Sequence, residues 1–169
     1  RFACLRRDLA ALFAGYYFAE LLSDLTDLHD PHPKLFDAAV ITLRHLGDAR
    51  LRTKRVIRFE LACLRELGLM PSLDACSHCG LVLETDTGPV AFGAATGGVL
   101  CRDCQPGQPH VLTLSAETLE SIRMLASPGP SWRQTEQDPA TLGSVRETVG
   151  AVMSHGLGHR PRLWPFQGV

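Results

Sequence analysis

The chain has 169 residues, of which 45% are hydrophobic and 21% are charged, and its formal net charge is −1. This composition excludes a disordered chain or a fibre, and it suits one hydrophobic core with a small additional module. The longest uncharged apolar run, residues 9–19, is too short to span a bilayer, and no signal-peptide pattern precedes it. We therefore expect a cytoplasmic protein that makes no membrane contact.

Apolar residues recur at helical spacing from about Phe2 to Leu28, which predicts one long core helix. The chain begins at Arg1, without an initiator Met, and enters this pattern at once. We therefore expect a longer protein whose N-terminal part precedes this sequence.

Pro31 and Pro33 interrupt the helical pattern, and two further amphipathic segments follow them. The first, residues 35–46, is stopped by Gly47, and the second, residues 49–67, ends at Gly68. Because the connections between the three segments are short, we expect antiparallel neighbours in a helical bundle.

The third predicted helix is unusually basic. Six basic residues and a single acidic one lie between Arg44 and Arg58. At 100° per residue, a basic stripe falls on the side of the helix opposite its apolar residues, and it is expected to face outward. This stripe is either a binding surface for phosphates or an acidic peptide, or an ordinary solvated helix face. The candidate binding residues of this region are Arg50, Arg52, Lys54, Arg55, Arg58 and Arg65.

Glu60 projects from the apolar side of the same helix. An unpaired carboxylate is costly to bury, so the position predicts a buried or half-buried partner, either an Arg or backbone donors. A catalytic role is disfavoured because no second carboxylate or nucleophile accompanies it in the sequence.

Two C-x-x-C pairs give the clearest chemical signal. Cys76 and Cys79 form the first pair, and Cys101 and Cys104 form the second. This spacing brings four thiolates to one point and predicts a single structural Zn²⁺, whose closed coordination sphere leaves no position for water. A pair of disulfides, or His78 in place of one sulfur, are the alternatives.

Helical periodicity is lost between the third helix and residue 110 and returns afterwards. Only short strands such as residues 90–92 are expected there, as in a zinc ribbon. Ser115 is the predicted N-cap of a fourth helix that ends near Ser127, and Asp138 with Pro139 begins a fifth. The fold class is therefore mainly α: about five helices with an inserted Cys₄ zinc finger. We divide the chain into residues 1–71, the zinc-finger insert 72–110, and residues 111–169.

Several segments together resemble the bacterial recombination mediator family RecO. They occur in the order that this family shows, from the first predicted helix to the fourth. They are residues 16–22 (YYFAELL), 33–36 (PKLF), 58–68 (RFELACLRELG), the two C-x-x-C pairs, here called the knuckles, with 97–100 (GGVL) before the second, and 114–115.

The resemblance implies a C-terminal helical domain with a zinc finger, whose missing N-terminal part is an OB-fold. Members of this family bind single- and double-stranded DNA, anneal complementary strands, and help RecR load RecA onto strands coated by single-strand-binding protein (SSB). They are not enzymes, and they act at the nucleoid. Near-neutral charge predicts that this part of the protein binds DNA poorly without the OB-fold.

In this family the acidic, hydrophobic C-terminal tail of SSB docks near the helix that carries the Arg-Phe-Glu-Leu segment. The resemblance therefore implies a cationic rim from Arg55, Arg58 and Arg65. Tyr16, Tyr17 and Phe59 are the candidates for its apolar pocket, although helical spacing also suits them to the core. The tail at 159–169 departs from the basic C-terminus common in the family.

Two other functions remain open. A zinc-ribbon scaffold for protein interactions, in a transcription or assembly factor, needs only the four cysteines. A zinc enzyme is disfavoured, because Cys₄ ligation is closed and no H-x-E general acid or base lies beside the knuckles.

Overall fold

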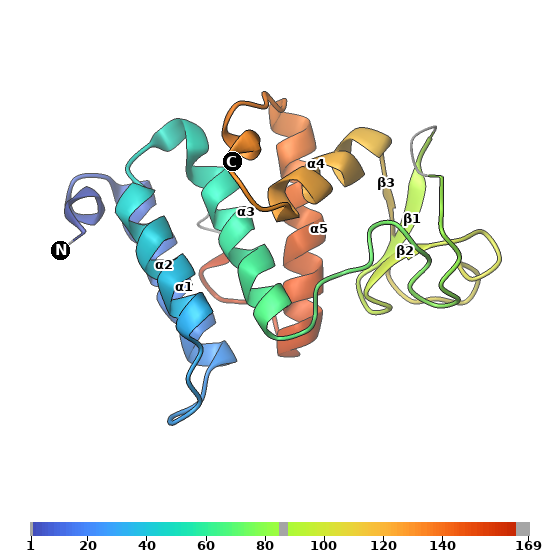
Figure 1. Ribbon diagram of the computed structural model, residues 1–169, viewed down its shortest axis with the longest axis horizontal. Coiled ribbons are helices and arrows are strands. Elements are labelled where there is room, and N and C mark those ends of the chain that lie inside the picture. Colours follow the sequence, from blue (N-terminus) through green and yellow to red (C-terminus); the bar gives the residue numbers. More distant parts are fainter. Residues whose placement is uncertain (1, 85–87, 165–169) are drawn as a thin grey trace.

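The computed structural model describes residues 2–84 and 88–164, and Figure 1 shows its arrangement. Within these residues, five α-helices and a small sheet confirm the predicted mainly α class. No described helix has the length and apolar character needed to cross a membrane. The elements in chain order are η1 (Ala3–Arg6), α1 (Leu9–Leu25), α2 (Pro33–His45), α3 (Ala49–Glu66), β1 (Val90–Gly93), β2 (Gly98–Leu100), β3 (Val111–Leu114), α4 (Ala116–Ala126), η2 (Ser131–Arg133) and α5 (Pro139–Leu157).

The first predicted helix, residues 2–28, is wrong at both ends. A short 3₁₀ helix comes first, and α1 begins only after Asp8, whose carboxylate accepts a 3.0 Å hydrogen bond from the Ala11 amide and pairs with Arg52. An N-cap of this kind satisfies a backbone donor that the helix leaves free. At the other end α1 stops at Leu25, and Leu28 is 91% exposed in the loop that follows.

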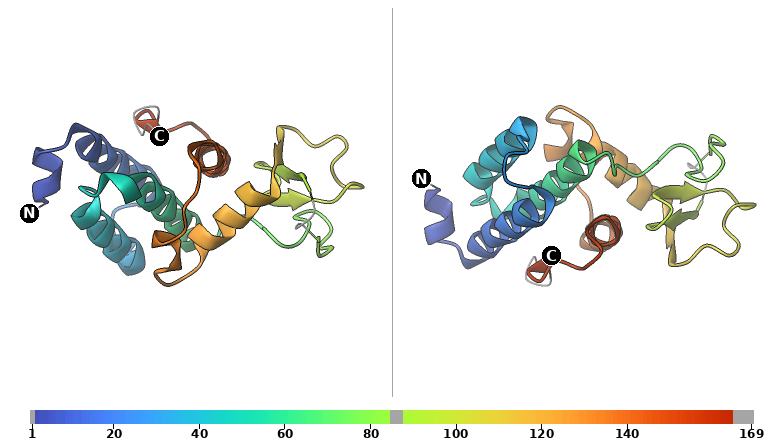
Figure 2. Two further views of the ribbon diagram at one scale, coloured as in Figure 1. Left: turned by 90° about the horizontal axis from the view of Figure 1, so that it is seen from above. Right: turned by 90° about the horizontal axis from the view of Figure 1, so that it is seen from below.

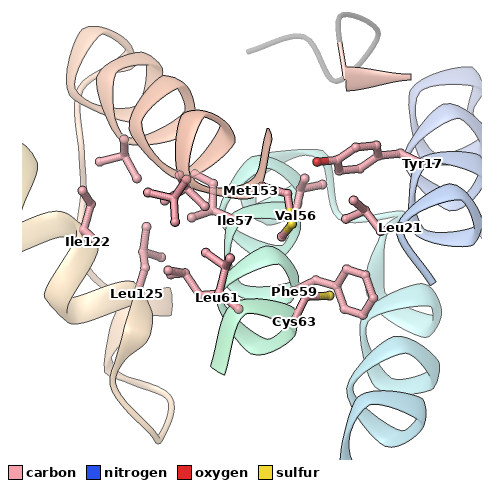
Figure 3. Close-up of a cluster of buried hydrophobic side chains, with 14 of the residues drawn as sticks. Tyr17, Leu21, Val56, Ile57, Phe59, Leu61, Cys63, Ile122, Leu125 and Met153 are labelled. Atoms are coloured by element: carbon pink, nitrogen blue, oxygen red, sulfur yellow. The ribbon is translucent and has the colours of Figure 1, made fainter. Parts of the chain in front are cut away.

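Helix α3 is the central element of the bundle. It packs against α1 and α2 on one side and against α4 and α5 on the other (Figure 1). Its apolar face is buried as predicted, and the centroids of the Phe59 and Phe18 rings are 4.2 Å apart. Figure 3 shows side chains from α1, α4 and α5 converging on it, including Tyr17, Ile122 and Met153.

The predicted partner of Glu60 is a buried arginine. The Glu60 carboxylate, which is fully buried, accepts hydrogen bonds from the guanidinium of Arg146 on α5 and from the hydroxyl of Tyr17 on α1. Burial raises the pKa of Tyr17, and the nearby Glu60 charge raises it further, so the phenol stays a donor. This contact joins α1, α3 and α5 through one carboxylate.

The cysteine-rich segment forms a finger that projects from one end of the bundle (Figure 2). Its antiparallel sheet has the strand order β2-β1-β3, so its third strand comes from beyond residue 110. The backbone of Ser72, just after α3, hydrogen-bonds with Gly97 and Val99 beside it, at 2.8 and 2.9 Å. From α4, Arg123 donates to the Leu73 carbonyl at 2.8 Å. Arg123 thus holds the start of the finger against α4, while the predicted three-part division stays a prediction.

The chain after α5 folds back onto the bundle. Glu20 of α1 accepts hydrogen bonds from the backbone amides of Arg162 and Leu163 at 2.7 and 2.9 Å. The centroid of the Trp164 ring lies 3.8 Å from the guanidinium carbon of Arg160 and 4.9 Å from the guanidinium carbon of Arg146. The described part of the predicted tail therefore covers the buried ion pair, and residues 165–169 of that tail lie outside the described residues.

Candidate metal centre and basic pocket

The fold brings the four predicted cysteine ligands together. The sulfur atoms of Cys76, Cys79, Cys101 and Cys104 all lie within 4.8 Å of one another. Those of Cys79 and Cys101 are 3.8 Å apart. A tetrahedral ion with metal–sulfur bonds of about 2.3 Å requires sulfur atoms about 3.8 Å apart, so this set suits a metal ion.

Local backbone geometry aims the sulfur atoms. In the first knuckle, the Cys76 amide donates to the Leu81 carbonyl and the Gly80 amide to the Cys76 carbonyl, both at 2.8 Å. Gly80 has φ of +77°, a conformation that favours glycine. In the second knuckle, the amides of Cys104 and Gln105 donate to the Cys101 carbonyl. Each turn therefore presents its two thiols on the same side.

The cysteines of this cluster are free thiols and form no disulfide. Burial acts to raise the pKa of the Cys76 thiol, but backbone donors from Cys101 and the first knuckle outweigh it and lower the pKa to about 6. His78 is exposed and does not belong to the cluster. Four sulfur ligands fill a tetrahedron, so a metal held here has no open position for a reacting water.

The six predicted basic residues separate into two groups: three near the start of α3 (Arg50, Arg52 and Lys54) and three further along it. Arg50 is exposed, and Arg52 pairs with Asp8 at the start of α1. The expectation of an outward stripe is wrong for Lys54, which is only 6% exposed and donates to the Thr135 carbonyl. The connection between α4 and α5 covers this part of α3. The second group, Arg55, Arg58 and Arg65, lies around a cavity.

This cavity, here called the basic pocket, has a volume of about 240 Å³ and lies between α2, α3 and the end of α4 with η2. Of the predicted pocket residues, only Phe59 lines it. Tyr16 is 57% exposed on α1, and the hydroxyl of the buried Tyr17 is bound to Glu60. The lining residues are Ala38, Ile41, Thr42, His45, Arg55, Arg58, Phe59, Ala62, Arg65, Leu125, Gly129, Trp132 and Arg133.

Positive charge around the pocket is only partly balanced. Burial lowers the pKa of Arg58, and the charges of Arg65 and Arg133 lower it further. Burial also lowers the pKa of Arg55, with Asp48 opposing and Arg133 adding to the effect. Clustered guanidinium groups that depress one another's pKa are stabilised when an anion binds between them.

Trp132 and Arg133 line the pocket, although neither was among the predicted binding residues. Trp132 is 5% exposed, and the guanidinium of Arg58 lies over its ring at 4.9 Å. Arg133 follows it in η2. The sequence carries no signal for either one, because the fold brings the α4–α5 connection to α3 across more than 60 residues of chain.

A larger cavity, of about 720 Å³, lies between the first turns of α4 and α5. None of the predicted site residues lines it. Its acidic side chains are Glu117, Glu120, Glu136 and Asp138. With these four acidic side chains and the single guanidinium of Arg123, the charge of this surface disfavours an anionic ligand.

Comparison of the sequence with known proteins identifies the family of this chain. Residues 6–165 match the family model described as "Recombination protein O C terminal". The DNA repair protein RecO of Anaeromyxobacter dehalogenans is 41% identical over 160 residues, which are 94% of this chain and 62% of the relative. That of Rhodopirellula baltica is 31% identical over 189 residues, or 98% of this chain and 70% of the relative. The chain thus spans about three fifths of the first relative's length, and it belongs to the recombination protein O family.

Proposed function

We propose that this chain is the C-terminal part of a DNA-repair recombination mediator and that its basic pocket binds the C-terminal tail of SSB. The relatives carry the name DNA repair protein RecO. In the whole protein this contact acts together with DNA, with RecR, and with the loading of RecA. The domain recognises and positions its partners and catalyses no reaction.

One observation carries the proposal: a hollow on α3 that combines a cationic rim with an apolar floor. Phe59, Ala62 and Leu125 supply the floor, and guanidinium groups surround it. The SSB tail has the complementary composition, with several carboxylates before a terminal Phe. Arginine forks suit carboxylates, and burying a Phe side chain contributes about 1.5–3 kcal/mol.

We propose zinc as the metal of the Cys₄ cluster. Thiolate ligands and tetrahedral geometry favour Zn²⁺, which would hold the two knuckles together and supply no reactive group. Its role is then to keep the finger folded beside α4 and α5.

DNA binding belongs mainly to the part of the protein that precedes this sequence. The described helices place most of the basic residues of α3 against backbone carbonyls or around the pocket, and the net charge of the chain is −1. Salt-dependent affinity for DNA rises with the number of phosphates neutralised, so this chain alone is a weak DNA binder.

Fluorescence anisotropy with a labelled SSB tail peptide tests the proposal. We expect binding that weakens at least about tenfold in Arg58→Glu, because the charge at the rim is reversed. Ala62→Leu, which fills the floor, should weaken it similarly. Removing the terminal Phe from the peptide should cost about tenfold or more.

Arg102→Glu is the matched control, since this residue is exposed on the finger and does not line the pocket. It should bind the peptide as the unchanged chain does. Thermal unfolding of each variant separates a lost contact from a lost fold, because Arg58 also donates to the carbonyls of Leu125 and Ser127 at 2.6 and 2.9 Å. Equal binding by all folded variants would overturn the proposal.

A further inference from the structure

Three arginines of the basic pocket already hold backbone carbonyl groups. Arg55 donates to the His45 carbonyl at 2.7 Å, Arg58 to those of Leu125 and Ser127, and Arg65 to that of Ala126 at 2.6 Å. These bonds close the ends of α2 and α4 against α3. A ligand that drew these guanidinium groups away would have to break bonds that shape the pocket.

Arg133 is different. Within residues 2–84 and 88–164, its guanidinium has no hydrogen-bond or ion-pair partner, and its contact is with the Trp132 ring at 5.3 Å. It is exposed at the edge of the pocket. All five of its donors are therefore available to a ligand, and using them breaks no bond within the protein.

The backbone that carries Arg133 is held on both sides. The Arg133 amide donates to the Pro130 carbonyl at 3.0 Å, and the neighbouring Trp132 is buried beneath Arg58. Two residues further on, the Thr135 carbonyl accepts from Lys54. Because this backbone is already fixed, the ordering that opposes ligand binding is that of the Arg133 side chain itself, about 0.5–1.5 kcal/mol.

We propose that Arg133 makes the main charge-paired contact with a carboxylate of the bound acidic peptide, and that Arg55, Arg58 and Arg65 chiefly hold the pocket walls. This inference rests on the proposed function and assigns within it the residue that determines specificity for an anionic ligand. A guanidinium and a carboxylate pair through two parallel hydrogen bonds, which a lysine cannot reproduce.

Binding of the labelled SSB tail peptide to Arg133→Ala, Arg133→Lys and Arg65→Ala, each with its thermal unfolding, tests this assignment. Arg133→Ala should bind at least about tenfold more weakly at an unchanged melting temperature, with a shallower dependence of affinity on salt. Arg133→Lys should lie between, because it keeps the charge and loses the fork. Arg65→Ala should lower the melting temperature and change affinity less.

The two proposals fail in different ways. If the unchanged chain does not bind the peptide, the proposed function and this assignment both fall. If it binds, and Arg133→Ala binds equally well or Arg65→Ala loses more, the assignment alone is overturned. Weakened binding supports the assignment when the variant is folded. An unchanged melting temperature shows that Arg133→Ala is folded.

Discussion

Glu60→Gln is expected to lower the free energy of unfolding by about 3–5 kcal/mol, the usual cost of breaking a buried ion pair. The substitution keeps the side-chain volume but leaves the Arg146 charge uncompensated at 3% exposure. Burial alone lowers the pKa of Arg146, and the Glu60 carboxylate reverses this and raises it. Urea unfolding followed by circular dichroism measures the change.

Two further variants sharpen this expectation. Glu147→Gln, at an exposed position on α5, is the matched control and should change stability by no more than about 0.5 kcal/mol. The double variant Glu60→Met with Arg146→Leu should recover part of the loss, since apolar residues can replace a buried pair. A loss in Glu60→Gln no larger than that of the control would show that the pair does not support the bundle.

Cys76→Ser is expected to abolish metal binding and unfold the finger while the helices persist. Among the described residues, the core beside the metal cluster holds just Cys76, Leu100 and Cys101, while Phe92 and Val99 of the finger belong to the large core of the bundle. The small core is too little to hold the two knuckles without the metal, whereas the helices keep most of the large one. Structural zinc in such sites contributes on the order of 10 kcal/mol. Elemental analysis should find one zinc per unchanged chain.

Hydrogen exchange locates the unfolding. In Cys76→Ser the amides of β1 and β2 should lose protection, while those buried in α3 keep it. Cys4→Ser replaces a cysteine outside the cluster and should leave both metal content and protection unchanged. A metal-free chain with protected strand amides would contradict the structural role of the metal.

The sequence predicted those features that depend on neighbouring residues. Ser115 caps α4 by accepting from the Thr118 amide at 3.1 Å, and Asp138 caps α5 through the amides of Ala140 and Thr141. The four cysteines lie together because two tight turns within the chain aim them. Capping and knuckle chemistry are local, so spacing alone identifies them.

Features that depend on distant contacts escaped prediction. The start of α1 is one such feature, because Asp8 there is paired with Arg52, 44 residues away. Lys54 lies on the polar side of its helix by periodicity, yet the Thr135 carbonyl, 81 residues along the chain, covers it. Arg133 lies at the pocket because the same connection between α4 and α5 packs against α3. Helical periodicity shows which face is polar, but it does not show what covers that face.

An NMR titration of the chain with the SSB tail peptide shows whether an acidic peptide occupies the basic pocket. We expect shifts in the backbone amide of Ala62 and the indole N–H of Trp132, with β1 and β2 of the finger unchanged. Shifts confined to the finger, or to Glu120 and Thr141 beside the acidic cavity, would contradict it.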